Sequence, residues 1–123
     1  NNPRDALRRL ENMVSMAGIT YPVHAIREQI SSALNIMVHI ERMTGGKRRI
    51  KNIAEITGTE GDVICLHDIF HYVQQGINRN GDAFGYFETT GIRPNLVNKL
   101  MAGGFNLPAT LFEKRILLKD DEE

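Results

Sequence analysis

Hydrophobic residues recur at helical spacing through the first third of the chain. Leucine, methionine and valine positions three or four residues apart predict an amphipathic helix that begins at the N-cap Asn2 and stops at Gly18. Pro3 suits the first helical position because its missing N–H would have no partner there. A second helix is expected from Tyr21-Pro22, with isoleucines on one face. Residues 1–34 are therefore predicted to form a helical pair.

The hydrophobic pattern changes to an alternation over residues 35–89, which is typical of strands. Residues that favour turns divide this region into four predicted strands, at 35–43, 48–57, 63–73 and 83–89. Residues Thr44 to Lys47 are of types that favour turns, so the first two strands are expected to form a hairpin. A polar loop is predicted from Gln74 to Asp82, where asparagine and glycine are frequent.

The third of these segments, 63–73, is also compatible with a helix. Its apolar residues alternate as a strand requires, yet Leu66, Ile69, Phe70 and Val73 would also share a helical face. We expect a strand because β-branched and aromatic residues dominate the segment.

The last third, 90–123, is predicted to hold two short helices and an acidic tail. Pro94 can open the first helix, which Gly103-Gly104 ends. Leu107-Pro108 begins the second helix, and the tail from Asp120 to Glu123 is expected to be frayed. Helices followed by strands, without βαβ alternation, indicate an α+β fold with an antiparallel meander. We therefore predict a single domain over residues 1–123.

Charge and composition argue against several classes of protein. Fifteen basic and fifteen acidic residues cancel, which argues against a nucleic-acid-binding protein. The single cysteine, Cys65, cannot form an internal disulfide and fits a reducing compartment. No apolar run reaches the roughly 20 residues that a membrane-spanning helix needs. Arg4, Asp5 and Arg8 would interrupt the apolar core of a signal peptide, so a cytoplasmic location is expected.

Metal and thiol chemistry is weakly supported by the sequence. His67-Asp68-x-x-His71 has the spacing that a helical zinc site uses, but on a strand the two histidines would lie roughly 13 Å apart. We therefore interpret them as ordinary strand residues and predict no metal site. Cys65 lies in an apolar run with no adjacent cation, which indicates a buried and inert thiol. Phe84 to Phe87 is interpreted as core packing rather than as an RNA-stacking platform.

Cations gather at the tip of the first predicted hairpin. They are Arg42, Lys47, Arg48, Arg49 and Lys51. A solvated turn is favoured over an anion or subunit contact. The glycines of the chain form no phosphate-binding loop, because none follows a hydrophobic strand and opens a helix. The residues by themselves therefore predict no catalytic group.

Several ordered stretches resemble the C-terminal part of the secretion ATPases of type II and type IV systems, and most of all the Flp/Tad pilus-assembly ATPases of the CpaF type. The stretches include Asn2-Pro3-Arg4-Asp5-Ala6-Leu7, Met16-Ala17-Gly18, Gly46-Lys47-Arg48-Arg49-Ile50, Glu60-Gly61-Asp62-Val63, Thr90-Gly91-Ile92-Arg93-Pro94 and Leu107-Pro108-Ala109. The resemblance covers nearly the whole chain, in the same order and with similar spacing. Gly45 and Thr59 depart from the family pattern, and the 74–82 segment matches least well.

The resemblance implies that this chain is the C-terminal part of a RecA-like α/β ATPase domain. In that family the Walker motifs precede this point, so a chain that begins on a helix cap is expected to be part of something larger. The parent would be a hexamer that binds ATP and Mg²⁺ in the cytoplasm, peripheral to the inner membrane, and contacts a membrane platform protein. The fragment itself is expected to be inactive. Arg4, Arg27, Arg48 and Arg49 are the expected cations at a nucleotide or at a subunit interface.

An alternative function is a non-catalytic protein-interaction module, which would also lack Walker motifs. Either hypothesis leaves the strand at 35–43 without a neighbour on one side. We therefore predict that the chain associates with itself, through an exposed apolar patch or by strand pairing.

Overall fold

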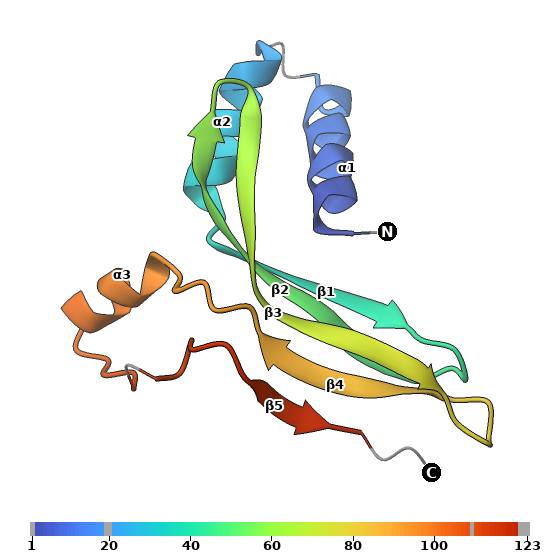
Figure 1. Ribbon diagram of the computed structural model, residues 1–123. Coiled ribbons are helices and arrows are strands. Elements are labelled where there is room, and N and C mark those ends of the chain that lie inside the picture. Colours follow the sequence, from blue (N-terminus) through green and yellow to red (C-terminus); the bar gives the residue numbers. More distant parts are fainter. Residues whose placement is uncertain (1, 19–20, 109, 121–123) are drawn as a thin grey trace.

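The computed structural model describes residues 2–18, 21–108 and 110–120. Two helices lead, a five-stranded sheet follows, and a third helix separates its last two strands (Figure 1). The elements are α1 (Pro3–Met16), α2 (Val23–Ala33), β1 (Ile36–Arg42), β2 (Arg48–Glu60), β3 (Val63–Ile77), β4 (Ala83–Thr89), α3 (Leu96–Ala102) and β5 (Ile116–Lys119). The chain is thus a mixed α+β fold, as the sequence predicts. No helix in the described part of the chain is long and apolar enough to span a bilayer.

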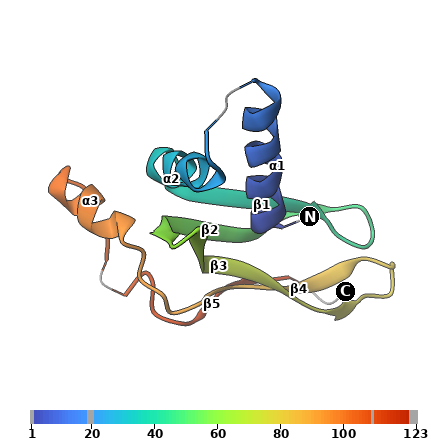
Figure 2. The same ribbon diagram turned by 90° about the horizontal axis from the view of Figure 1, so that it is seen from above.

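The sheet is an antiparallel meander in which the strands follow their order along the chain, from β1 to β5. All four predicted strands are confirmed, including the ambiguous third one. The long β2–β3 hairpin is its centre, with Glu60 opposite Val63 at the turn. All four ladders contain a register shift of one residue, and the β2–β3 ladder contains two. Such bulges increase the local twist, and Figure 2 shows how strongly the sheet turns along its length.

The two helices pack against the upper end of the β2–β3 hairpin, beside its turn (Figure 1). Leu7 of α1 meets Ile26 and Ile30 of α2, and both helices bury these residues against Ile56 and Ile64 of the hairpin. The helical spacing of these side chains is what gives each helix one apolar face. The first core of the molecule therefore lies between the helical pair and the hairpin.

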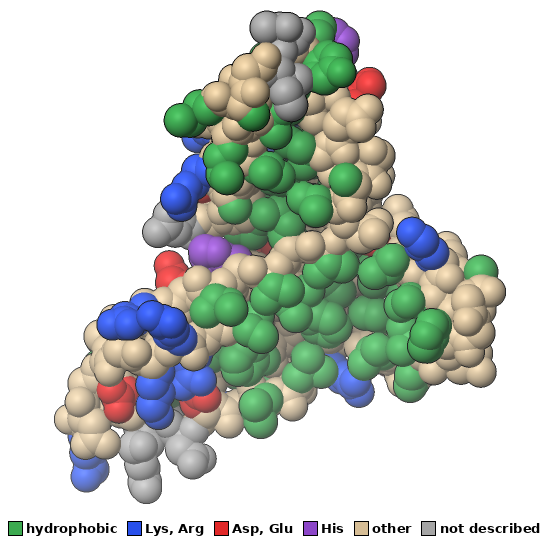
Figure 3. Space-filling view, turned by 180° about the vertical axis from the view of Figure 1, so that it is seen from behind, with side chains coloured by type: hydrophobic (Ala, Val, Ile, Leu, Met, Phe, Trp, Pro, Cys, Tyr) green, Lys and Arg blue, Asp and Glu red, His purple; other side chains and the backbone are tan. Residues whose placement is uncertain are grey.

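The second core lies farther along the sheet and contains Met43, Tyr72 and Ala83, with Phe87 packed against them. The rings of Tyr72 and Phe87 meet edge to face, with centroids 4.9 Å apart. This contact supports the interpretation of the 84–87 segment as core packing. Elsewhere, no described segment forms a second layer over the sheet. Seen from behind, hydrophobic side chains form a broad patch over the strands (Figure 3).

The two ends of α1 follow the sequence signals. The Asn2 side chain accepts a hydrogen bond from the backbone N–H of Asp5, as an N-cap does. Gly18 adopts a positive φ of 80° directly after α1, which is the left-handed stop that the sequence predicts. The short α3 is held differently, because the buried carboxylate of Glu55 on β2 accepts hydrogen bonds from the N–H groups of Asn95 and Leu96.

Three expectations for loops and termini are wrong. The segment from Gln74 to Asp82 is not all loop, because β3 continues to Ile77 and only a tight turn remains. In that turn the Asn78 side chain accepts the N–H groups of Asn80 and Asp82. The described residues 110–115 form no second short helix after Leu107-Pro108, and turns lead into β5 instead. Ala109 of the quoted motif lies outside the described residues.

The acidic tail is the third correction. Asp120 is not frayed, because its N–H donates to the carbonyl of Gly85 and its carboxylate enters the second core. Residues 121–123 lie outside the described part of the chain. The fourth ladder and the backbone hydrogen bond of Asp120 together fix residues 116–120 to β4.

Candidate functional site: an arginine-lined hollow

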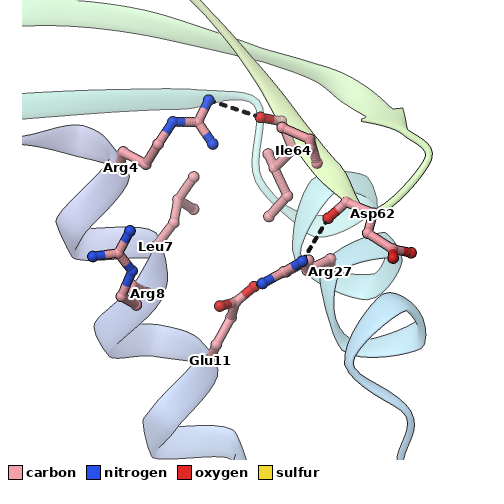
Figure 4. Close-up of a pocket in the computed structure, with 8 residues that line it drawn as sticks. Arg4, Leu7, Arg8, Glu11, Arg27, Asp62 and Ile64 are labelled. Carbon is pink, nitrogen blue, oxygen red and sulfur yellow. Dashed lines mark hydrogen bonds and ion pairs between the residues drawn. The ribbon is translucent and has the colours of Figure 1, made fainter.

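A hollow of about 140 Å³ lies between α1, α2 and the first residues of β3 (Figure 4). Its walls are built around three arginines, Arg4, Arg8 and Arg27, and one carboxylate, Glu11. The apolar floor is formed by Leu7, Val63 and Ile64. On α1 the polar residues stand three or four positions apart, so a single helix face presents them all.

Arg4 is fixed across the hollow. Its Nη2 donates to the carbonyl oxygen of Ile64, 2.9 Å away and on the first residues of β3. This contact uses one of the five N–H donors of the guanidinium group. The rest of the group remains at the rim, because the residue as a whole is exposed.

Arg27 joins the two helices to the β2–β3 turn. Its Nε donates to Glu11 Oε1 at 2.5 Å, and its Nη1 donates to the backbone oxygen of Asp62 at 2.8 Å. The hydrogen bond to Glu11 raises the pKa of Arg27 above its ordinary value, and the charge of Glu11 adds to this effect. The side chain therefore stays charged, and its two hydrogen bonds hold it between the helices and the hairpin turn.

Arg8 has an exposed side chain, and its Nη1 lies 3.8 Å from a carboxylate oxygen of Asp5 one turn earlier. Figure 4 shows the Asp62 carboxylate directed away from the hollow, so Glu11 is the carboxylate that faces it among the residues drawn. The hollow thus holds three guanidinium groups, of which that of Arg27 pairs with the Glu11 carboxylate. Such a site suits the oxygens of a phosphate or of another chain's carboxylate, which guanidinium groups bind with paired N–H donors.

The structure separates the four arginines that the sequence singles out. Arg4 and Arg27 meet at the hollow, whereas Arg48 and Arg49 lie at the far end of the sheet, on the first residues of β2. Arg48 is exposed and stands opposite Arg42 in the β1–β2 ladder. It therefore fits the interpretation of the hairpin tip as a solvated turn.

The side chain of Arg49 is mostly buried among other groups of the protein. Its Nη2 lies 2.9 Å from Asp120 Oδ2, and its guanidinium carbon lies 5.0 Å from the centre of the Tyr72 ring. Among the residues that the structure describes, the buried Nε–H finds no acceptor. Arg49 therefore belongs to the second core and faces away from anions in solution.

Tyr72 and Asp120 complete that cluster, and sequence reasoning missed both. The Tyr72 hydroxyl donates to Asp120 Oδ2 at 2.5 Å, and the Gly85 N–H donates to the same oxygen at 3.2 Å. Burial raises the pKa of Tyr72 to about 12, and the hydrogen bond to Asp120 contributes to the shift while Arg49 opposes it. No sequence pattern links the two residues, because 48 positions separate them.

The histidines of β3 are strand residues, as predicted. His71 Nε2 pairs with Glu88 Oε1 across the β3–β4 ladder at 2.8 Å. Asp68 accepts a hydrogen bond from the side-chain amide of Asn52. Cys65 is half-buried rather than buried, which corrects the expectation of a fully enclosed thiol.

A second hollow, of about 350 Å³, is apolar apart from His71. Ile50, Ile53, Phe70 and Phe87 line it together with Leu117 and Leu118 of β5. These residues come from four adjacent strands, so the groove crosses the sheet. Sequence reasoning did not find it, because β5 itself was not predicted.

Comparison of the chain with protein-family models and with curated proteins returned no match.

Proposed function

We propose that this chain is the C-terminal part of a hexameric, RecA-like ATPase that powers pilus assembly or type II/IV protein secretion. The observation that carries the proposal is the ordered set of stretches that resemble CpaF-type ATPases, from Asn2 to Leu111-Phe112. Many stretches in the same order and at similar spacing are specific in a way that one short motif is not.

The arginine-lined hollow supports the proposal physically. Arg4 and Arg27, two of the cations that the resemblance implies, come together there although 23 positions separate them along the chain. Their backbone hydrogen bonds hold the guanidinium groups in place before any ligand arrives. Preorganised cations of this kind stabilise a charged oxygen at low entropic cost.

In the proposed motor, ATP and Mg²⁺ bind to an upstream part of the same domain, and the bound metal neutralises the charge that develops on the phosphates. This chain contributes cations from Arg4, Arg8 and Arg27 toward a neighbouring subunit or toward a nucleotide phosphate. The parent acts in the cytoplasm, peripheral to the inner membrane, and its platform protein is the membrane partner.

Nucleotide binding tests the proposal directly. The titration uses a magnesium-bound, non-hydrolysable ATP analogue against this chain and against a version extended upstream through a Gly-rich lysine loop. We expect the extended chain to bind and this chain alone not to bind. Binding by neither protein contradicts the motor hypothesis.

A second experiment tests the hollow in the full-length motor. Arg27→Ala and Arg4→Ala are expected to lower ATP turnover or to weaken hexamers, because each removes a fixed cation. Arg79→Ala is the matched control, since Arg79 is an exposed arginine on the β3–β4 turn. Unchanged turnover and hexamer formation in both hollow variants would rule out the assigned role of these arginines.

A non-catalytic protein-interaction module is the second candidate, and the apolar groove across four strands favours it. A partner's apolar side chain would fit a groove of this size. The two candidates differ in the gene: the motor requires a reading frame that continues upstream of Asn1 into a Gly-rich lysine loop, and the module does not.

A further inference from the structure

The dipeptide Asn80-Gly81 lies at the tip of the β3–β4 turn, and both of its residues are exposed. Of the asparagines in the chain, only Asn80 precedes a glycine. Every other asparagine precedes a residue that carries a side chain. Asparagine is a thermolabile residue, and a glycine after it leaves the next peptide nitrogen unshielded. The sequence therefore sets this one asparagine apart.

The turn holds Asn80 by its backbone and leaves its side chain without a partner. The Asn80 N–H donates to Asn78 Oδ1 at 2.9 Å, whereas no hydrogen bond holds the Asn80 side-chain amide among the described residues. Gly81 adopts a φ of 82°, and an added methyl group there would meet no atom of a more distant residue within 4 Å. The Gly81 N–H donates to the Asn78 carbonyl at 3.1 Å. One exposed hydrogen bond thus separates the Gly81 nitrogen from reaction.

We propose that Asn80-Gly81 is a site of spontaneous deamidation. The Gly81 nitrogen attacks Cγ of Asn80, the Cγ–Nδ2 bond breaks, and Nδ2 leaves as ammonia with the proton of the Gly81 N–H. Water then opens the cyclic imide at one of its two carbonyl carbons. One product is aspartate, and the other is isoaspartate, whose main chain runs through the former side chain. The reaction consumes only water, so it is independent of the proposed motor function.

The β3–β4 turn is joined to the β1–β2 turn, so a change at its tip reaches the second core. The Ala83 N–H donates to the Thr44 carbonyl at 2.8 Å, and Figure 1 shows both turns at the same end of the sheet. An added methyl group at Gly45 would lie 2.7 Å from Cα of Asp82, so the two backbones touch. Isoaspartate adds one methylene to the main chain of a tight turn. It therefore loosens the contact between the turns, next to Ala83 of the second core.

Ageing of the full chain at mildly alkaline pH tests the reaction, with peptide mapping by mass spectrometry as the readout. The Asn80 peptide should gain the mass difference between an amide and a carboxyl group, and chromatography should resolve its aspartate and isoaspartate forms. The folded chain should convert roughly two- to tenfold more slowly than the chain in guanidinium chloride, because one exposed hydrogen bond has to open first. Asn78 and Asn98 are internal controls and should stay unchanged.

Two results of the ageing experiment overturn the proposal. If Asn80 stays intact in the folded chain after it has reacted in the unfolded chain, the turn is closed to the reaction. If Asn78 and Asn98 convert as fast as Asn80 in the folded chain, the site has no selectivity.

Hydrogen exchange tests the effect on the two turns. Asn80→Gln keeps the backbone N–H that binds Asn78, and its longer side chain closes the imide ring much more slowly, so this variant should stay unmodified. After equal ageing, the Ala83 N–H should exchange severalfold faster in the native sequence than in Asn80→Gln. Equal exchange in the two aged proteins contradicts the loosening of the turns. Circular dichroism before ageing confirms that both proteins are folded.

Discussion

The hydroxyl of Tyr72 and the carboxylate of Asp120 meet at 2.5 Å, although 48 positions separate these residues in the sequence. Asp120 also accepts a hydrogen bond from the Gly85 N–H and pairs with Arg49. This one carboxylate therefore links β2, β3 and β4 to the residue that follows β5. The side chains of Tyr72, Arg49 and Asp120 are all mostly buried. In such surroundings the partners depend on one another, because a group that loses its partner remains poorly hydrated.

Asp120→Ala should lower the free energy of unfolding by about 2–4 kcal/mol, because it leaves the Tyr72 hydroxyl and the Arg49 guanidinium without their acceptor. Urea denaturation at neutral pH measures the change. Asp62→Ala, which removes an exposed carboxylate, should change the stability much less. Similar losses in both variants would show that the cluster adds nothing specific.

The raised pKa of Tyr72 makes stability depend on pH in the alkaline range. A folded-state pKa of about 12, against an unfolded value near 10, means that the folded protein keeps its phenolic proton to higher pH. The contribution is fully present below pH 10 and is lost as the pH rises through about 12. Tyr72→Phe should therefore flatten the alkaline loss of stability, measured as the difference between the urea midpoints of the two proteins.

Absorbance titration of the phenolic groups provides the matching spectroscopic test. The chain contains three tyrosines, so Tyr72→Phe removes one of three phenolic groups from the titration. A late-titrating component should be present in the native protein and absent from Tyr72→Phe. An ordinary titration of all three groups would contradict the shift.

Glu55→Ala should release α3 from the sheet. The two carboxylate oxygens of Glu55 accept the N–H groups of Asn95 and Leu96 at 2.8 and 2.7 Å, and the side chain is 4% exposed. Without it, two N–H groups at the helix start lose their acceptor, so we expect a loss of about 2–3 kcal/mol. Hydrogen exchange should accelerate in α3 first. Glu60→Ala on the same strand is the exposed control, and equal exchange in both variants would contradict the anchoring role.

Gly85→Ala should destabilise the sheet strongly. An added methyl group would overlap the carbonyl oxygen of Val73 and lie 2.9 Å from Cα of Gln74, so the backbone of β3 would have to move. We expect a loss of about 3 kcal/mol or more, whereas Gly76→Ala should cost less because its methyl group would meet the Phe84 ring, which can shift. Thermal unfolding compares the two. A larger effect at Gly76 would contradict this reasoning.

Much of the fold could be predicted from the sequence. The Asn2 cap, the Gly18 stop and the turns near Gly45 and Gly61 are local signals, and the structure uses each of them. The antiparallel order followed because short connections join neighbouring strands. The predictions that failed concern segments with a weak local pattern. The four residues of β5 are all exposed, so hydrophobic and polar residues do not alternate along this strand.

The candidate site, like the fold, could be predicted only in part from the sequence. The sequence could nominate arginines, but it could not say which of them meet. Arg27 reaches Glu11 and Asp62 only because α2 packs beside α1 and under the hairpin turn. Arg49 reaches Asp120 only because the chain returns along β4 at its end.

The sequence by itself determined the helical pair and the four main strands, because these depend on periodicity and on backbone preferences within a few residues. The ends of β2 and β3, at Glu60 and Ile77, lie beyond the ends that the sequence predicts. Only the tertiary structure decided which charges share one environment. The grouping of Arg4 with Arg27, the enclosure of Arg49 by Tyr72 and Asp120, and the attachment of α3 through Glu55 all depend on contacts between distant segments. Such contacts are set by packing and by the pairing of buried polar groups, and these leave no periodic trace along the chain.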